Sequence, residues 1–229
     1  MKPLRILPVI HSLISSVLSI APCPIYTPKF FTQKLDHRSN SSTTFQQQYQ
    51  LVTDFFQLGG PILYTVSLES SVMRCVESLA FLDYAQELGA IVAVLEHRFF
   101  GDSFPPGVSD SNATAEDFAP LALDNVLLDS VTFVDWIKST VTGANKSKVI
   151  VEGGSYAGTL ATLLRLRYPT TFYGSMPSAP PLRSLGPLQS NPYKYNWWEW
   201  VSLVISALKC TLTFHRCHRY MKTNHSKHL

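Results

Sequence analysis

The sequence predicts an α/β fold built on a doubly wound, mostly parallel sheet. Three short apolar runs at residues 62–66, 90–95 and 148–152 have the composition of strands that are covered on both faces. Stretches with helical spacing of apolar residues, at 72–88, 118–139 and 159–168, alternate with these runs. Strands and helices that alternate in this order form a sheet with right-handed crossovers.

Turn and breaker residues delimit these elements. Apolar and polar residues alternate over 44–51, which predicts an antiparallel strand at the edge of the sheet. Gly59-Gly60-Pro61 is a turn signal directly before the first buried strand. Pro169 ends the last helix, because proline cannot continue it.

Composition excludes several classes of protein. The 229 residues are 45% hydrophobic and 15% charged, with a net charge of +3, which is typical of a globular chain. Basic residues cluster without acids in the tail at 208–229, but no basic stripe with interleaved aromatic residues occurs elsewhere. A solvated tail explains that cluster better than a nucleic-acid site does, so we expect no nucleic-acid partner.

The N-terminus has the layout of a secretory signal peptide. Lys2 and Arg5 precede a mostly apolar run at 6–20, and small residues allow cleavage after Ala21. A buried N-terminal helix is the alternative. No other stretch reaches the roughly 18 apolar residues of a membrane span. We therefore expect residues 1–21 to be removed and the product to be secreted or lysosomal/vacuolar.

Glycosylation sequons agree with export. They begin at Asn40, Asn112 and Asn145, in polar sequence typical of loops. A fourth, at Asn224, lies in the tail. The four cysteines, Cys23, Cys75, Cys210 and Cys217, match no zinc pattern, so we expect no metal and no cofactor. Disulfides are possible, but the sequence leaves their pairing open.

Small residues surround a serine where the third strand meets the following helix. The segment reads Gly153, Gly154, Ser155, Tyr156, Ala157 and Gly158. A serine at such a tight turn is lifted above the sheet edge, and only small residues fit two positions to either side of it. The next backbone N–H, that of Tyr156, then points at a developing oxyanion. Ser155 is thus the candidate nucleophile.

Two other interpretations of this turn compete with a nucleophile. A plain glycine-rich connection between strand and helix would need no chemistry, and a single match to Gly-x-Ser-x-Gly with Ala157 in the last position is weak by itself. A nucleotide-binding turn would need Gly-x-Gly-x-x-Gly, or a lysine at the phosphate-loop position, and neither is present.

Further motifs occur in a fixed order along the chain. They lie at 31–37, 45–49, 59–64, 95–105, 153–158, 168–169 and 178–180. In order and spacing they resemble the serine peptidase family of lysosomal Pro-Xaa carboxypeptidase, dipeptidyl peptidase II and thymus-specific serine protease. The resemblance covers roughly Phe30 to Val201.

The resemblance implies an α/β-hydrolase core with a helical cap inserted after the serine turn. It also implies a secreted or lysosomal glycoprotein that cleaves peptides on the carboxyl side of a proline near one terminus, with Ser155 as nucleophile. Carboxypeptidase and dipeptidyl peptidase activity both stay open. For Glu96-His97-Arg98 we expect a structural role, as a buried Glu96–Arg98 ion pair, and no catalytic role for His97.

The rest of a catalytic triad is not evident. The family's aspartate and histidine lie far downstream of the serine, whereas here the only later carboxylate is Glu199 and the later histidines lie in the tail. The turn at 65–69 also lacks the glycines expected at a second oxyanion donor. The resulting division is a signal peptide at 1–21, a truncated core at 22–181, the start of the cap at 182–207 and an unassigned tail at 208–229.

Three functions follow as hypotheses. The first is a proline-specific serine exopeptidase, weakly active or inactive in this chain because a serine without its histidine is a poor nucleophile. The second is a secreted pseudoenzyme or binding protein that keeps the fold without the triad. The third is a lipase or esterase on the same fold, against which the motifs at 95–105 and 153–158 speak.

Overall fold

The computed structural model describes residues 28–66, 69, 71, 81–109 and 111–182. Nearly all of them belong to one compact unit, residues 1–180. The expected signal peptide, the tail and the four cysteines lie outside the described residues, as does the expected cap apart from Leu182.

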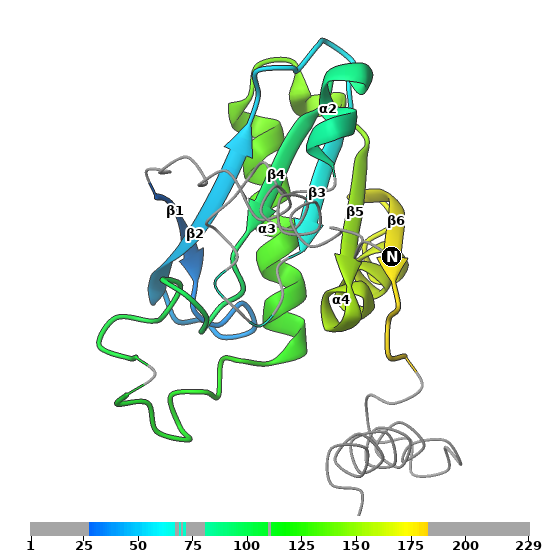
Figure 1. Cartoon of the computed structure of the whole chain (residues 1–229). Coiled ribbons are helices and arrows are strands. Elements are labelled where there is room, and N and C mark those ends of the chain that lie inside the picture. The colour runs from blue at the N-terminus through cyan, green and yellow to red at the C-terminus, as the bar shows by residue number, and fades with distance from the viewer. Residues whose placement is uncertain (1–27, 67–68, 70, 72–80, 110, 183–229) are drawn as a thin grey trace, which may run out of the picture. The chain divides into compact units, whose positions relative to one another are not determined.

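One six-stranded sheet runs through the described residues (Figure 1). Its strands are β1 (Lys29–Lys34), β2 (Thr44–Val52), β3 (Ile62–Val66), β4 (Ile91–Leu95), β5 (Val149–Gly154) and β6 (Phe172–Ser178). Their order across the sheet is β1-β2-β4-β3-β5-β6. β2 pairs antiparallel with β1 and β4, whereas the pairs from β4 to β6 are parallel. The predicted mostly parallel sheet is confirmed.

Helices cover both faces of this sheet. α3 (Leu123–Thr140) and α4 (Ser155–Arg167) pack against one face, where alternate residues of β3, β4 and β5 form the larger core. α2 (Leu82–Leu88) packs on the other face, against Leu63 and Val92. Figure 1 shows α2 in front of the sheet and α3 behind it. A short 3₁₀ helix, η2 (Ala144–Lys146), follows α3.

Several predicted boundaries were wrong. β2 is antiparallel but is not the edge strand, because β1 lies outside it. Neither β1 nor β6 was expected. β6 contains Gly174 and Pro177, which weaken a strand signal but are tolerated in a strand at the edge of a sheet. α3 begins at Leu123 instead of Phe118, and α4 begins at Ser155 instead of Thr159. Most of the expected helix at 72–88 lies outside the described residues.

A fully buried arginine holds the end of β4 in place. The guanidinium of Arg98 forms a bidentate ion pair with Asp129 of α3, with both N–H···O distances 2.6 Å. Its other N–H groups donate to the backbone carbonyls of Lys34, Leu35 and Pro120, at 3.2, 2.7 and 2.8 Å. All five guanidinium N–H groups therefore have an acceptor, as a buried charge requires.

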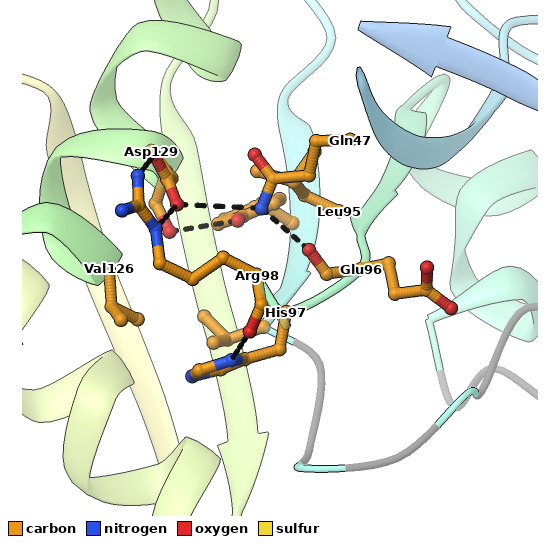
Figure 2. A pocket seen from close by; sticks show the side chains of 10 residues that line it. Gln47, Leu95, Glu96, His97, Arg98, Val126 and Asp129 are labelled. Carbon is orange, nitrogen blue, oxygen red and sulfur yellow. Dashed lines mark hydrogen bonds and ion pairs between the residues drawn. The ribbon is translucent and has the colours of Figure 1, made fainter. Parts of the chain in front are cut away.

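Other polar side chains complete the shell around the Asp129 carboxylate. His37 Nε2 lies 2.8 Å from its Oδ1, and the backbone N–H of His37 donates to Asn125. Gln47 donates to the Glu96 carbonyl at 2.7 Å and lies 3.5 Å from Asp129 Oδ2, as Figure 2 shows. His37, the last residue of the motif at 31–37, thus connects the segment after β1 to α3 by hydrogen bonds.

The expected Glu96–Arg98 ion pair is wrong. In Figure 2 the Glu96 carboxylate points away from the Arg98 guanidinium. It instead accepts hydrogen bonds from the Asp102 N–H and the Ser103 hydroxyl, at 2.9 and 2.7 Å. Burial raises the pKa of Glu96 although both bonds favour its charged form.

The turn after β4 explains why the side chains of Glu96 and Arg98 point in different directions. Phe99 and Gly101 have φ values of 67° and 57°, so the chain folds back on itself at this point. A Cβ on residue 101 would lie 2.0 Å from Glu96 Oε1. Glu96 is therefore enclosed by its own turn, while Arg98 is left to pair with α3.

We predict that Arg98→Met lowers the free energy of unfolding by about 3–5 kcal/mol, because it leaves the buried Asp129 charge without its partner. Urea denaturation monitored by circular dichroism measures this. Arg167→Met is the matched control, since it breaks the exposed Arg167–Asp124 pair (2.7 Å, side chains 47% and 46% exposed) and costs less than about 1 kcal/mol. Equal losses in the two variants would contradict the structural role of Arg98.

Candidate active site

Ser155 stands at a strand–helix junction with no residue between the two elements. β5 ends at Gly154, and α4 begins at Ser155. Ser155 is exposed and has a φ of 53°, a conformation that costs a residue with a side chain about 1–3 kcal/mol. A sharp, strained turn of this kind presents the hydroxyl of a nucleophilic serine. The geometry fits the predicted nucleophile, whose chemical role stays a prediction.

Backbone crowding explains the small residues around this turn. A Cβ on Gly153 would lie 2.4 Å from the carbonyl oxygen of Ala157, and one on Gly158 would lie 2.9 Å from the oxygens of Gly153 and Ser178. Real Cβ contacts are not this short. At Gly154, in contrast, a Cβ would meet nothing within 4 Å. The close approach therefore requires glycine at 153 and 158 and leaves 154 unconstrained by packing.

The first turn of α4 offers a donor for an oxyanion. Backbone N–H groups in a first helical turn have no acceptor inside the helix, and no side chain of the described residues caps α4. The Tyr156 N–H is one of these groups, and the positive end of the helix dipole adds to its effect. The second donor was expected in the turn at 65–69, of which residues 67 and 68 lie outside the described residues, so it stays untested.

His97 contacts the residue that follows the serine. Its Nε2 lies 3.3 Å from the Tyr156 hydroxyl, and its Nδ1 lies 2.8 Å from the Arg98 carbonyl oxygen. The imidazole also packs against the rings of Phe100 and Tyr156, with centroids 5.2 and 5.7 Å away. Burial, together with the negative charge of Glu69, raises the pKa of Tyr156, so its hydroxyl stays protonated.

The structure brings no triad partner to Ser155 within the described residues. No described side chain is hydrogen-bonded to its hydroxyl. His37 is bonded to Asp129, and His97 is bonded to Tyr156. The carboxylate of Glu152 accepts from the hydroxyl of Thr65 on the neighbouring strand, at 2.8 Å. Glu199 and the histidines of the tail lie outside the described residues.

The three sequon asparagines within the described residues, Asn40, Asn112 and Asn145, are exposed. Asn40 lies in the β1–β2 connection and Asn145 in η2. The Asn112 side chain is engaged in its own loop, where its Nδ2 donates to the Gly107 carbonyl at 2.9 Å. Among the described residues, no three His, Cys, Asp or Glu residues lie close enough together to hold a metal ion, and no helix is long and apolar enough to cross a membrane.

The sequence analysis missed the role of Asp129 and the contact between Tyr156 and His97, and a signal existed only for Asp129. Asp129 is one of the buried residues of α3, on the same face as Val126 and Phe133. A carboxylate in such a position predicts a buried cation, and Arg98 in a motif directly after a buried strand was the natural candidate. The bond between Tyr156 and His97 left no signal, because nothing in the local sequence places the ends of β4 and β5 together.

Known proteins resemble this chain. A family model described as serine carboxypeptidase S28 matches residues 33–223, and so extends past Val201 into the tail. The bovine (Bos taurus) lysosomal Pro-X carboxypeptidase is 32% identical over 160 residues, which are 69% of this chain and 32% of that protein. Its mouse (Mus musculus) counterpart is 32% identical over 187 residues, 78% and 38% of the two chains.

Two further relatives extend the comparison. The Caenorhabditis elegans prolyl carboxy peptidase like protein 5 is 35% identical over 140 residues, which are 60% of this chain and 27% of that one. A solved esterase from Pyrococcus furiosus is 15% identical, with a TM-score of 0.45, over 68% of this chain and 50% of that one. This chain spans about a third of the length of the mammalian relatives it matches.

We predict that Gly153→Ala destabilises the protein by about 1–3 kcal/mol, because its methyl group would overlap the Ala157 backbone. Gly154→Ala is the matched control. Residue 154 has a φ of −104° and open space around its Cα, so this change shifts the unfolding free energy by less than about 0.5 kcal/mol. Thermal and urea unfolding of both variants test the contrast. Equal stability of the two variants would argue against the close turn.

We also predict that His97 makes stability depend on pH. Burial lowers the pKa of His97 below 6.5, and this effect outweighs the Arg98 carbonyl and the carboxylates of Asp129 and Glu69. The unfolded state then binds more protons, so the stability due to His97 is fully present above pH 6.5 and is lost as the pH falls from there through the lower pKa of the folded state.

Urea unfolding between pH 5 and 7.5 measures this slope. His97→Phe should flatten it by at most about 1.4 kcal/mol per pH unit, which corresponds to one proton. His37→Phe is the comparison, because it removes the histidine that is bonded to a carboxylate. A slope that His97→Phe leaves unchanged would show that His97 has the same pKa in the folded and unfolded states, and would contradict the prediction.

Proposed function

Because this chain belongs to the serine carboxypeptidase S28 family, we propose that it supplies the nucleophile Ser155 to a serine-type exopeptidase that hydrolyses peptide bonds after proline. The fold is of the α/β-hydrolase type, and Ser155 occupies its strand–helix junction. The observation that carries the proposal is the φ of 53° at Ser155, together with the close approach of Gly153 to Ala157. An ordinary connection between a strand and a helix needs neither a positive φ at a serine nor such a close approach of the backbone.

The proposed chemistry is acyl transfer. The Ser155 hydroxyl oxygen attacks the carbonyl carbon of the scissile bond and forms an acyl-enzyme, while the Tyr156 N–H donates to the oxyanion. Loss of one such donor typically costs about 3 kcal/mol of transition-state stabilisation. A histidine must take the serine proton and pass it to the leaving amine. No described histidine is bonded to Ser155, so we expect turnover of this chain to be weak.

Substrate and location follow from the relatives. Several of them are named lysosomal Pro-X carboxypeptidase. We therefore propose peptides with proline near one terminus as substrates, and a lysosomal or secreted location reached through residues 1–21. The exposed Asn40, Asn112 and Asn145 agree with glycosylation on that route. The relatives' names favour the carboxypeptidase mode over the dipeptidyl peptidase mode.

A second candidate function is a secreted binding protein that keeps the fold without catalysis. The specific observation in its favour is the Ser155 hydroxyl, which has no hydrogen-bond partner among the described side chains. His37 and His97 are engaged elsewhere. The two candidates differ in whether Ser155 reacts.

Fluorophosphonate labelling of the expressed 229-residue chain tests the nucleophile. We expect slow labelling that maps to residue 155 by mass spectrometry and is absent in Ser155→Ala. Ser178→Ala, at the end of β6, is the control and should label like the wild type. Labelling that persists in Ser155→Ala would refute the assignment, and a complete lack of labelling would favour the binding protein.

Peptide cleavage tests the specificity. An N-blocked peptide ending in Pro-Phe reports carboxypeptidase activity, and a free Ala-Pro amide reporter reports dipeptidyl peptidase activity. We expect release after proline only, and mainly from the first peptide. Turnover should be about 10⁴ to 10⁶ below that of a complete triad. Cleavage of matched alanine peptides at the same rate would contradict proline specificity.

A further inference from the structure

His97 joins the buried ion pair of Arg98 and Asp129 to the serine turn. Its backbone lies next to Arg98, whose side chain is fixed by five hydrogen bonds. His97 is only 5% exposed, and its side chain reaches the Tyr156 hydroxyl. His97 follows β4, and Ser155 follows β5. Because β3 lies between these two strands, the contact between His97 and Tyr156 spans the width of β3.

The partners of the imidazole define its tautomer. A backbone carbonyl can only accept a hydrogen bond, so His97 Nδ1, 2.8 Å from the Arg98 oxygen, carries the proton. Burial favours the neutral ring, which leaves Nε2 as an acceptor. The Tyr156 hydroxyl, 3.3 Å away, is then the donor. The chain of hydrogen bonds therefore has one direction, from Tyr156 to His97 and from His97 to the Arg98 carbonyl.

The imidazole has little freedom to leave this position. The ring of Phe100 meets it edge-on at 81°, with the centroids 5.2 Å apart. A cavity of about 10 Å³ is lined by His97, Tyr64, Asp129 and Ser130 (Figure 2). That volume has room for about one water and is too small for an imidazole ring. The His97 side chain is thus held in one position, where it binds the Tyr156 hydroxyl.

We propose that His97 is a positioning residue for the active site: it holds the Tyr156 side chain and thereby orients the first turn of α4, which carries Ser155 and the oxyanion-binding N–H. The expected effect on the reactivity of Ser155 rests on the proposed function. The hydrogen bond between His97 and Tyr156 can be tested whether or not Ser155 is a nucleophile. Tyr156 is the second residue of α4, so its anchored side chain restrains the free end of the helix. Misplacement by about 1 Å can cost a hundred-fold in rate.

The tautomer is tested by ¹⁵N nuclear magnetic resonance of the full chain labelled in histidine. Seven histidines contribute signals, and loss of one set in His97→Gln assigns residue 97. At pH 7.5 we expect the neutral Nδ1–H form, with Nε2 as a hydrogen-bond acceptor. In Tyr156→Phe the Nε2 resonance should move to the position of a free acceptor. An Nε2–H tautomer, or no change in Tyr156→Phe, would overturn the proposal.

Positioning is tested by hydrogen exchange and by labelling in the same variants. Tyr156→Phe and His97→Phe should speed exchange of the first hydrogen-bonded amides of α4, at 158–162, by about ten-fold. They should slow fluorophosphonate labelling of Ser155 by a similar factor. Tyr64→Phe is the matched control, since it removes another buried tyrosine hydroxyl, bonded to Ser130 at 2.9 Å, and should change neither rate. The double variant Tyr156→Phe/His97→Phe should change the exchange and labelling rates no more than either single variant does, because both substitutions break the same hydrogen bond.

The outcomes separate this inference from the proposed function. If the wild type does not react with fluorophosphonate, the proposed function fails for this chain, while resonance and exchange still decide the role of His97. If labelling occurs but Tyr156→Phe and Tyr64→Phe have equal exchange and labelling rates, the positioning role is refuted and the nucleophile stands. Tyr156→Phe, which deletes one oxygen atom, keeps the test valid should His97→Phe fail to fold.

Discussion

The ion pair between Arg98 and Asp129 is the constraint on which the described fold depends. An arginine without solvent exposure is tolerable only where every N–H group has an acceptor, and here the acceptors come from the end of β1, the loop before α3 and α3 itself. These segments are far apart in sequence, so the pair forms only when they meet. A lysine could not replace Arg98, because its compact ammonium group cannot reach acceptors in five fixed directions.

This constraint reaches the serine turn through neighbouring residues. Glu96, His97 and Arg98 have different partners. The Glu96 side chain binds the turn that follows it, the His97 side chain binds Tyr156, and the Arg98 side chain binds α3. One short segment thus closes a turn, supports the candidate active site and anchors the sheet edge. The segment is diagnostic in the sequence because each of its side chains has a separate geometric task, although none is placed to react with a substrate.

The order of buried strands and helices could be predicted from the sequence, because continuous apolar runs and helical spacing are local signals. The strand–serine–helix junction could also be predicted, since the glycines needed for close approach are visible around Ser155. The partner of Arg98 could not. Glu96 is the nearest acid in sequence, but the positive φ values at Phe99 and Gly101 turn the chain and enclose Glu96. The edge strands were missed because a polar residue, Gln33, is buried in β1, and because β6 contains a proline, Pro177.

The two sides of the serine are not equivalent. At position 153 the backbone of residue 157 leaves no room for a methyl group, whereas position 157 itself carries one and is fully buried. A search pattern that demands glycine on both sides of the serine would reject this chain, although the backbone turn that the pattern describes is present. A pattern that keeps glycine before the serine and allows alanine after it follows the geometry more closely, and would retrieve proteins in which the same turn has gone unnoticed.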